Sequence, residues 1–248
     1  MNINEQKKYY KNPQIKRFFW QTNHVYLKKK EKELIATLRN IILNNNYSKI
    51  LEVGCGEGAN ILNLNLKNEI IGIDYSKGKI NFAKKQKKKK KNKFFVQDAA
   101  SLNFDDNSFD LVYCRDLLHH LKEKKKAIDE MIRVAKKKVI IIENNGNNPL
   151  IWLFAAFVKI ERDAKNSKKS KIMHLLRQNK RKKFNINVYY KEPFPFFRFI
   201  YHYNFGLASL ANFKIFNFIN NTVNFISKYV IPKFFWGYII YEINLKEK

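Results

Sequence analysis

The chain has 248 residues, which is enough for one α/β domain with an appended cap and short for two independent domains. Forty-nine lysines and arginines against 21 aspartates and glutamates give a net charge of +28, which ordinarily indicates a polyanionic partner or a membrane surface. Only eight of these cations are arginine, whereas nucleic-acid recognition favours arginine. We therefore regard nucleic acid as the less favoured partner and attribute part of the lysine excess to coding bias.

The cysteines and the apolar segments argue against metal-binding, disulfide-rich, secreted and membrane-spanning classes of protein. Cys55 and Cys114 are far apart and fit no metal-binding spacing, so we expect no metal site and no disulfide framework, only small, buried, reduced residues. The first 14 residues contain no apolar run of the secretory type, which predicts a cytoplasmic location. Residues 149–158 form the longest uncharged apolar stretch, about half of the ~20 residues needed to span a bilayer. This stretch fits a buried or an interfacial helix.

In chain order, residues 24–43 come first, where apolar side chains recur at helical spacing between charges and predict an amphipathic helix. Short apolar runs then alternate with helical patterns. Strands are expected at 49–54, 69–75, 93–99, 109–114 and 137–144, with helices at 58–67, 76–88 and 122–135. We interpret the lysine run at 84–93 as a solvated helix end and its loop. The alternation predicts an α/β fold with a doubly wound, mostly parallel sheet.

The pattern changes after residue 147. Asn148 and Pro149 suit the N-cap and first position of a new helix, and residues 184–191 and 236–246 are typical of strands. Between these strands, residues 193–235 contain no acidic residue and many aromatic ones, which we interpret as an inserted, mostly helical cap. The expected organisation is thus an N-terminal helical segment (1–48), a core (49–146) and a C-terminal part of the same domain (147–248).

Three glycines, Gly54, Gly56 and Gly58, follow the first expected strand. A glycine turn between a parallel strand and a helix lets the backbone approach a ligand closely. About twenty residues on, the second strand ends in Asp74, where a carboxylate can accept both hydroxyls of a ribose, and the third ends near Asp98. Because strand ends share one edge of the sheet, these residues predict a nucleoside site, although a plain tight turn would also need the glycines.

On these motifs, residues 49–144 resemble the class I S-adenosylmethionine-dependent methyltransferases of the small-molecule type (methyltransferase domain 11-like). The resemblance implies a seven-stranded Rossmann-like sheet whose last strand is antiparallel, and S-adenosyl-L-methionine as cofactor. A cationic sulfonium suits a turn flanked by Glu52 and Glu57, whereas a phosphate loop would offer a lysine. A dinucleotide oxidoreductase is therefore disfavoured.

The resemblance also assigns cofactor contacts. The methionine part would be held by Glu52, Gly54, Cys55, Gly56 and Gly58. Asp74 would bind the ribose hydroxyls and Tyr75 would flank the adenine. Asp98 would receive the adenine amino group near the backbone of Ala99, and Arg115 would border the sulfonium and the acceptor.

Catalytic candidates follow the fourth strand, where Asp116, His119 and His120 are expected beside the reactive methyl group. Methyl transfer is an in-line displacement for which alignment supplies much of the acceleration, and a histidine base is needed only if the acceptor loses a proton. The alternative is that these histidines satisfy backbone groups or line a wall. Trp20 and His24 are candidates for an N-terminal lid over the cofactor.

The aromatic, acid-free insert favours a small or lipid-linked acceptor that is O- or C-methylated, with peripheral contact at an anionic membrane surface on the inner face. One alternative is an RNA methyltransferase, although no amino-methylating Asn/Asp-Pro-Pro-Tyr-type tetrapeptide follows the fourth strand. A non-catalytic cofactor-binding or scaffolding subunit is the alternative from another class.

Overall fold

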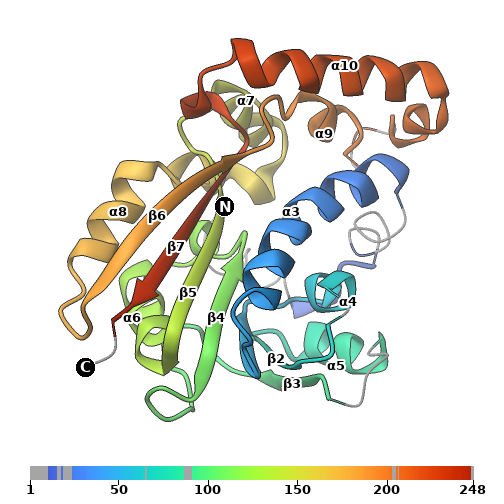
Figure 1. The fold of residues 1–248 in the computed structure, drawn as a ribbon. Coiled ribbons are helices and arrows are strands. Elements are labelled where there is room, and N and C mark those ends of the chain that lie inside the picture. Colours follow the sequence, from blue (N-terminus) through green and yellow to red (C-terminus); the bar gives the residue numbers. More distant parts are fainter. Residues whose placement is uncertain are drawn as a thin grey trace.

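The computed structural model describes residues 11–15, 18, 24–64, 66–86, 91–202, 205 and 207–246. At its centre lies a seven-stranded sheet in the order β3-β2-β1-β4-β5-β7-β6 (Figure 1). The strands are β1 (Lys49–Val53), β2 (Glu69–Asp74), β3 (Lys93–Val96), β4 (Phe109–Arg115), β5 (Ala135–Asn144), β6 (Phe184–Lys191) and β7 (Tyr238–Leu245).

The first five strands are parallel to one another, and β7 is antiparallel to both β5 and β6. The chain runs outward from β1 to β3 and then returns to the other side of β1 with β4. This reversal creates a topological switch point between β1 and β4, where open α/β sheets bind ligands at the carboxyl ends of the strands. The expected sheet, including its antiparallel last strand, is confirmed.

Burial explains why these segments are strands. The inner strands β1 and β4 are covered on both faces, so nearly every residue is buried and most are apolar. At the edge, β6 alternates between partly buried and exposed residues, with asparagines on its outer face. Both cysteines are buried and free, as expected.

Helices cover both faces of the sheet. On one face, α3 (Val25–Leu43), α4 (Ala59–Leu64) and α5 (Lys77–Gln86) contribute Leu38, Ile61 and Ile80 to a core cluster. On the other, α6 (Lys124–Val134) and α8 (Lys169–Arg177) contribute Ile128 and Ile172. The sheet is therefore doubly wound. Helix α8 was not expected, although its buried residues Ile172 and Leu176 lie four positions apart, as on one face of a helix.

A further group of helices lies near the end of the sheet where β5 meets β7 (Figure 1). It contains α7 (Pro149–Phe157), η2 (Lys159–Asn166), α9 (Phe196–Ile200), η3 (Ala208–Asn212), α10 (Lys214–Val230) and η4 (Lys233–Phe235). The expected cap begins with α9, and its helical character is confirmed. The side chain of Asn148 accepts a hydrogen bond from the backbone N–H of Leu150 at 2.8 Å, which confirms the expected N-cap of α7. Among the described residues, no helix is long and apolar enough to cross a bilayer.

Candidate active site

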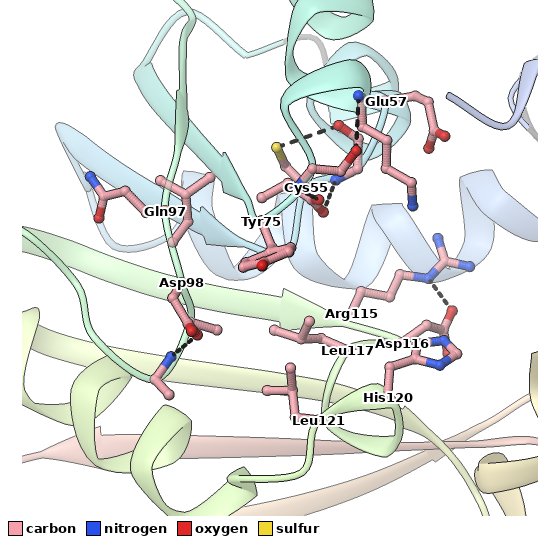
Figure 2. A pocket seen from close by; sticks show the side chains of 18 of the residues that line it. Cys55, Glu57, Tyr75, Gln97, Asp98, Arg115, Asp116, Leu117, His120 and Leu121 are labelled. Atoms are coloured by element: carbon pink, nitrogen blue, oxygen red, sulfur yellow. Dashed lines mark hydrogen bonds and ion pairs between the residues drawn. The ribbon is translucent and has the colours of Figure 1, made fainter. Parts of the chain in front are cut away.

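A cavity of about 1510 Å³ opens at the carboxyl ends of the parallel strands, beside the switch point. Typical single-ligand sites measure ~300–1,000 Å³, so this cavity has room for two small molecules. Eleven of the thirteen expected site residues line it: Gly54, Cys55, Gly56, Asp74, Tyr75, Asp98, Ala99, Arg115, Asp116, His119 and His120. Figure 2 shows Tyr75 between Asp98 on one side and Arg115 on the other. The fold therefore brings most of the candidates from separate strand ends into one space.

The glycine loop connects β1 to α4, and all three of its glycines have positive φ. A Cβ atom at Gly54 would lie 2.6 Å from the side chain of Leu117, and one at Gly58 would lie 3.3 Å from Ala83 and Phe94. Gly56 differs, since no atom of the described residues lies within 4 Å of the position its Cβ would take. Gly54 and Gly58 are thus required by packing and conformation, whereas Gly56 leaves open space on the cavity side.

Asp74 joins the end of β2 to this loop. Its two carboxylate oxygens accept hydrogen bonds from the backbone N–H groups of Gly56, at 3.0 Å, and of Ser76, at 2.9 Å. A carboxylate offers about four lone-pair directions, so each oxygen retains the capacity to accept a bond from a ligand hydroxyl. The next residue, Tyr75, leaves 61% of its surface exposed beside the cavity.

At the end of β3, Asp98 and Ala99 form the far wall of the cavity. The carboxylate of Asp98 accepts a hydrogen bond from the backbone N–H of Ala100 at 2.8 Å, and the side chain remains exposed. Gln97, which was not among the expected residues, also lines the cavity and accepts a bond from the backbone N–H of Asn103. This wall offers carboxylate, amide and backbone groups within one short segment.

Glu52 and Gly58, both expected to contact the cofactor, are not among the cavity-lining residues. Glu52 is fully buried beneath the glycine loop and accepts hydrogen bonds from Asn60, at 2.7 Å, and from the hydroxyl of Tyr113, at 3.0 Å. Burial raises the pKa of Glu52 to about 7, although these hydrogen bonds lower it. Arg115 in turn donates to Asn60 at 3.1 Å, so Glu52 supports the site through Asn60.

Asp116 follows β4 with a φ of 49°, an uncommon conformation for a residue other than glycine. Its carboxylate accepts hydrogen bonds from Asn144, at 3.0 Å, and from the hydroxyl of Tyr238, at 3.1 Å, and lies 3.4 Å from Nε of Arg115. The guanidinium of Arg115 also lies over the ring of Tyr238. Asp116 therefore orients Arg115 at the cavity wall.

Glu143, at the end of β5, organises the turn after β4. One of its oxygens accepts hydrogen bonds from the backbone N–H groups of Leu117, at 2.9 Å, and Leu118, at 2.6 Å. The other lies 2.7 Å from Nδ1 of His119 and accepts from the hydroxyl of Ser167 at 3.1 Å. Because those backbone groups begin the short helix η1 (Leu118–His120), this buried carboxylate fixes the histidine pair in place.

The two histidines differ in their surroundings. His119 is 1% exposed and lies between Glu143 and Glu161, whose carboxylate is 3.6 Å from Nε2. Burial lowers its pKa, but the two carboxylates outweigh burial and raise it to about 10. The two carboxylates therefore favour the protonated form of His119, which has no lone pair with which to accept a proton. His120 is only partly buried and lines the cavity.

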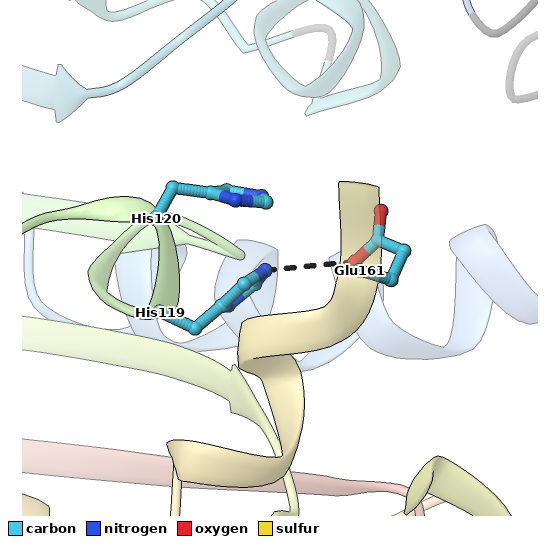
Figure 3. Close-up of side chains that lie close together, drawn as sticks. All are labelled: His119, His120 and Glu161. Atoms are coloured by element: carbon cyan, nitrogen blue, oxygen red, sulfur yellow. Dashed lines mark ion pairs between the residues drawn. The ribbon is translucent and has the colours of Figure 1, made fainter. Parts of the chain in front are cut away.

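His119, His120 and Glu161 also bring potential metal ligands within 4.8 Å of one another. Figure 3 shows these three side chains close together. A metal ion requires the lone pair of a neutral imidazole, and the carboxylates around His119 stabilise its cationic form instead. We therefore assign no metal to this cluster, and the expectation of a metal-free site stays a prediction.

The N-terminal segment reaches the cavity at Lys11 and Asn12. The backbone carbonyl of Lys11 accepts a hydrogen bond from the hydroxyl of Ser76 at 2.9 Å, and the backbone N–H of Gln14 donates to Glu57 at 2.6 Å. Of the two lid candidates, Trp20 falls outside the described residues. His24 lies instead beside Tyr201, with 5.9 Å between ring centroids.

Four residues that hold the site together were not anticipated: Asn60, Glu143, Asn144 and Tyr238. Glu143 could have been found, because it ends an apolar strand in the same way as Asp74 does. Tyr238 is distant in sequence from its partners Arg115 and Asp116 and carries no motif, so only the antiparallel pairing of β7 with β5 places it at the site.

Comparison with known proteins matches residues 51–142 to the methyltransferase domain family. The uncharacterized methyltransferase YcgJ of Bacillus subtilis is 30% identical over 131 residues, which are 50% of this chain and 52% of that protein. Ajmaline N-methyltransferase of Rauvolfia serpentina is 36% identical over 99 residues, 38% of this chain and 34% of that protein. The match thus spans about half of one curated relative and a third of the other.

The structure of the plantazolicin methyltransferase BamL, in complex with a triazolic desmethylPZN analog and SAH, has a TM-score of 0.62 at 16% identity, over 99% of this chain and 96% of that chain. At this identity the likeness shows the fold alone. Residues 51–142 match the methyltransferase domain family, and the sheet order and the glycine loop followed by Asp74 agree with the expected class I S-adenosylmethionine-dependent methyltransferase fold.

Proposed function

We propose that the chain binds S-adenosyl-L-methionine along the carboxyl ends of β1, β2 and β3 and transfers its methyl group to a small or lipid-linked acceptor beside Arg115 and His120. The observation that supports this most is the cavity itself, whose 1510 Å³ joins the glycine loop to the histidine pair. Such a volume can hold a nucleoside cofactor together with an acceptor.

The residues present fit the cofactor. The open space at Gly56 can admit an amino-acid tail against the loop, and the remaining lone pairs of Asp74 suit two ribose hydroxyls. Tyr75, Asp98 and Ala99 offer an aromatic face, a carboxylate and backbone groups for an adenine. When bound, the cofactor supplies an activated methyl group.

The wall formed by η1 and the end of β4 would receive the acceptor. His120 would remove a proton from a hydroxyl or an acidic carbon, which corresponds to O- or C-methylation. His119, held as a cation, would position its neighbour. Arg115, oriented by Asp116, would place a polar group of the acceptor in line with the methyl group, and this alignment would provide much of the acceleration.

The relatives support a small-molecule acceptor, since ajmaline N-methyltransferase and the phosphoethanolamine N-methyltransferase of Triticum aestivum are both named for small amines. No observation favours RNA or a purely scaffolding role. Because these relatives are N-methyltransferases by name, the acceptor panel must include amines as well as hydroxyls and activated carbons.

Calorimetry with S-adenosylhomocysteine tests the proposal. Wild type is expected to bind, and Asp74→Ala to lose at least tenfold in affinity because a ribose hydroxyl loses its charged acceptor. Asp105→Ala is the matched control, since this exposed aspartate lies away from the cavity. The assignment would be overturned if wild type did not bind S-adenosylhomocysteine, or if Asp74→Ala bound it as tightly as wild type does. Methyl transfer from labelled cofactor to the acceptor panel then identifies the methylated atom.

A further inference from the structure

Helix α10 turns polar residues toward the protein and apolar residues toward solvent, the reverse of an ordinary surface helix. The side that packs inward carries Asn220, Asn224 and Ser227, which are 2%, 7% and 6% exposed. Asn224 donates hydrogen bonds to the backbone carbonyl and the side-chain oxygen of Asn220, so part of this buried polarity is satisfied within the helix. A helix normally turns its apolar stripe toward the protein, and this one turns it outward.

The outward side is apolar in both halves of the helix, where residues lie one, three or four positions apart and so share one face, and the exposed Asn221 and Thr222 separate the two halves. We call it the α10 outer face, and it consists of Ile215, Phe218, Ile219, Phe225, Ile226, Tyr229 and Val230, which are between 41% and 77% exposed. Figure 1 shows α10 along the outer margin of the molecule, away from the central sheet.

The size of this face is at least in the range of the largest apolar patch on a typical monomer. A full aromatic side chain offers about 150–250 Å², so Phe218, Phe225 and Tyr229, each more than 60% exposed, contribute roughly 400 Å². The four aliphatic residues add to this area. The largest apolar patch on a typical monomer covers ~300–600 Å² and is commonly an interaction site.

Contacts on the inner side of α10 and just after its end connect it to the rest of the protein. Val223 packs on a small cluster formed by Phe197 and Tyr201 of the α9 segment and by Ala211 of η3. After α10, the backbone carbonyls of Phe234, Phe235 and Trp236 accept hydrogen bonds from the side chains of Asn145 and Asn148 at the start of α7.

The charges beside the face indicate its partner. Lys214, Lys228 and Lys233 are exposed on or next to α10, and residues 193–235 contain no acidic residue. A helix with aromatic and aliphatic residues on one side and lysines at its margin is typical of peptides that lie in the bilayer interface, where anionic headgroups attract the lysines. We propose that the α10 outer face docks this protein on a lipid bilayer that contains anionic lipids.

A second copy of the chain is a poorer occupant. A two-fold interface brings the same patch of both copies together, which would place the three lysines of one copy near those of the other with no acidic residue in the segment to offset them. In a bilayer, by contrast, the apolar residues of the α10 outer face can enter the acyl region while anionic headgroups attract the three lysines. The 17-residue helix would lie in the interface plane, since no described helix is able to span a membrane.

Vesicle co-sedimentation of the full chain tests this inference. Wild type is expected to bind vesicles of phosphatidylcholine with 30% phosphatidylglycerol at low salt, and to bind pure phosphatidylcholine vesicles at least tenfold less tightly. Phe218→Glu and Phe225→Glu are each expected to weaken binding to the anionic vesicles by about tenfold or more, because each removes a large apolar anchor and adds a repelled charge.

Phe95→Glu is the matched control, since Phe95 is 41% exposed on the edge strand β3 and lies outside the cap. This variant is expected to bind vesicles as wild type does, after circular dichroism shows that all variants are folded. The inference is overturned if wild type ignores the anionic vesicles, or if Phe218→Glu and Phe225→Glu bind them as tightly as Phe95→Glu. It is likewise overturned if wild type forms a dimer that Phe225→Glu dissociates. The affinity for S-adenosylhomocysteine, measured in the same variants, tests the proposed methyltransferase function separately from membrane binding.

Discussion

Glu143 and His119 form a fully buried pair, with Oε2 of the glutamate 2.7 Å from Nδ1 of the histidine and neither side chain accessible to solvent. Because of this pair, the adjacent residues His119 and His120 differ in burial and in their charged neighbours. The carboxylates of Glu143 and Glu161 favour the protonated form of His119, whereas His120 is only partly buried. Both side chains line the cavity, but they have different electrostatic surroundings.

The first prediction concerns this difference. His120→Ala is expected to lower kcat for a hydroxyl or carbon acceptor by about 10²–10⁴-fold, the usual contribution of a general base, while affinity for S-adenosylhomocysteine stays at the wild-type value. Steady-state kinetics on the acceptor identified by the panel, together with calorimetry, measures both quantities. Unchanged kcat in this variant would show that alignment alone suffices and that no base acts at this position.

The second prediction concerns the stability supplied by His119. Its pKa is raised in the folded state from 6.5 to about 10, so its contribution is fully present below pH 6.5 and is lost as the pH rises toward 10. His119→Gln is expected to reduce the free energy of unfolding by a few kcal/mol at pH 6 and by less at pH 9.5. Urea unfolding at both values measures the difference. His174→Gln, an exposed helical control, is expected to show a small, flat difference, and the same flat profile for His119→Gln would contradict a buried cation.

The third prediction concerns the pH dependence of stability at Glu52. Burial raises the pKa of Glu52 from 4.5 to about 7, so the folded protein holds a proton that the unfolded chain releases between these values. Glu52 therefore contributes less stability as the pH rises from 4.5 to 7. Glu52→Gln is expected to become more stable relative to wild type across this window, by on the order of 2–3 kcal/mol. Thermal unfolding at pH 5 and pH 8 measures the trend, and Glu69→Gln, a surface variant paired with Lys93, is the control.

Much of the fold was accessible from the sequence, because buried parallel strands are continuous apolar runs that alternate with helical patterns. The strand at 184–191 was predicted with its observed bounds. Ends set by tertiary contacts were less accessible: the helix expected at 58–67 ends at Leu64, and β3 ends at Val96. The expected cytoplasmic location and the division of the chain at residues 48 and 146 stay predictions.

Candidate site residues could be predicted where the residue type alone suits one part of the cofactor, as at Gly56, Asp74 and Asp98. They could not be predicted where a residue acts through a distant partner. The placement of Glu52 beneath the loop depends on Asn60 and Tyr113, and the fixed cation at His119 depends on Glu143 and Glu161. Helix α10 shows the same limit, since its apolar periodicity could not reveal which side faces the protein.

The fourth prediction separates two glycines of the same loop. Gly54→Ala places a methyl group 2.6 Å from Leu117 at a φ of 76°, so overpacking and left-handed strain together are expected to cost roughly 2–5 kcal/mol of unfolding free energy. Gly56→Ala meets no atom of the described part of the chain within 4 Å, and only the strain of its φ, about 1–2 kcal/mol, is expected. Its methyl group, however, would enter the space assigned to the amino-acid end of the cofactor.

Gly56→Ala is therefore expected to remain folded and to lose at least tenfold in affinity for S-adenosylhomocysteine. The main effect of Gly54→Ala is expected to be the loss of unfolding free energy. Urea unfolding and calorimetry on both variants distinguish these effects. Adenosine, which lacks the amino-acid tail, is the decisive control ligand: the substitution at Gly56 should leave its affinity near the wild-type value, because the contacts of Asp74 with the ribose are retained. Equal losses for both ligands would mean that the loop at Gly56 does not face the tail and that the nucleoside lies in a different orientation along the strand ends.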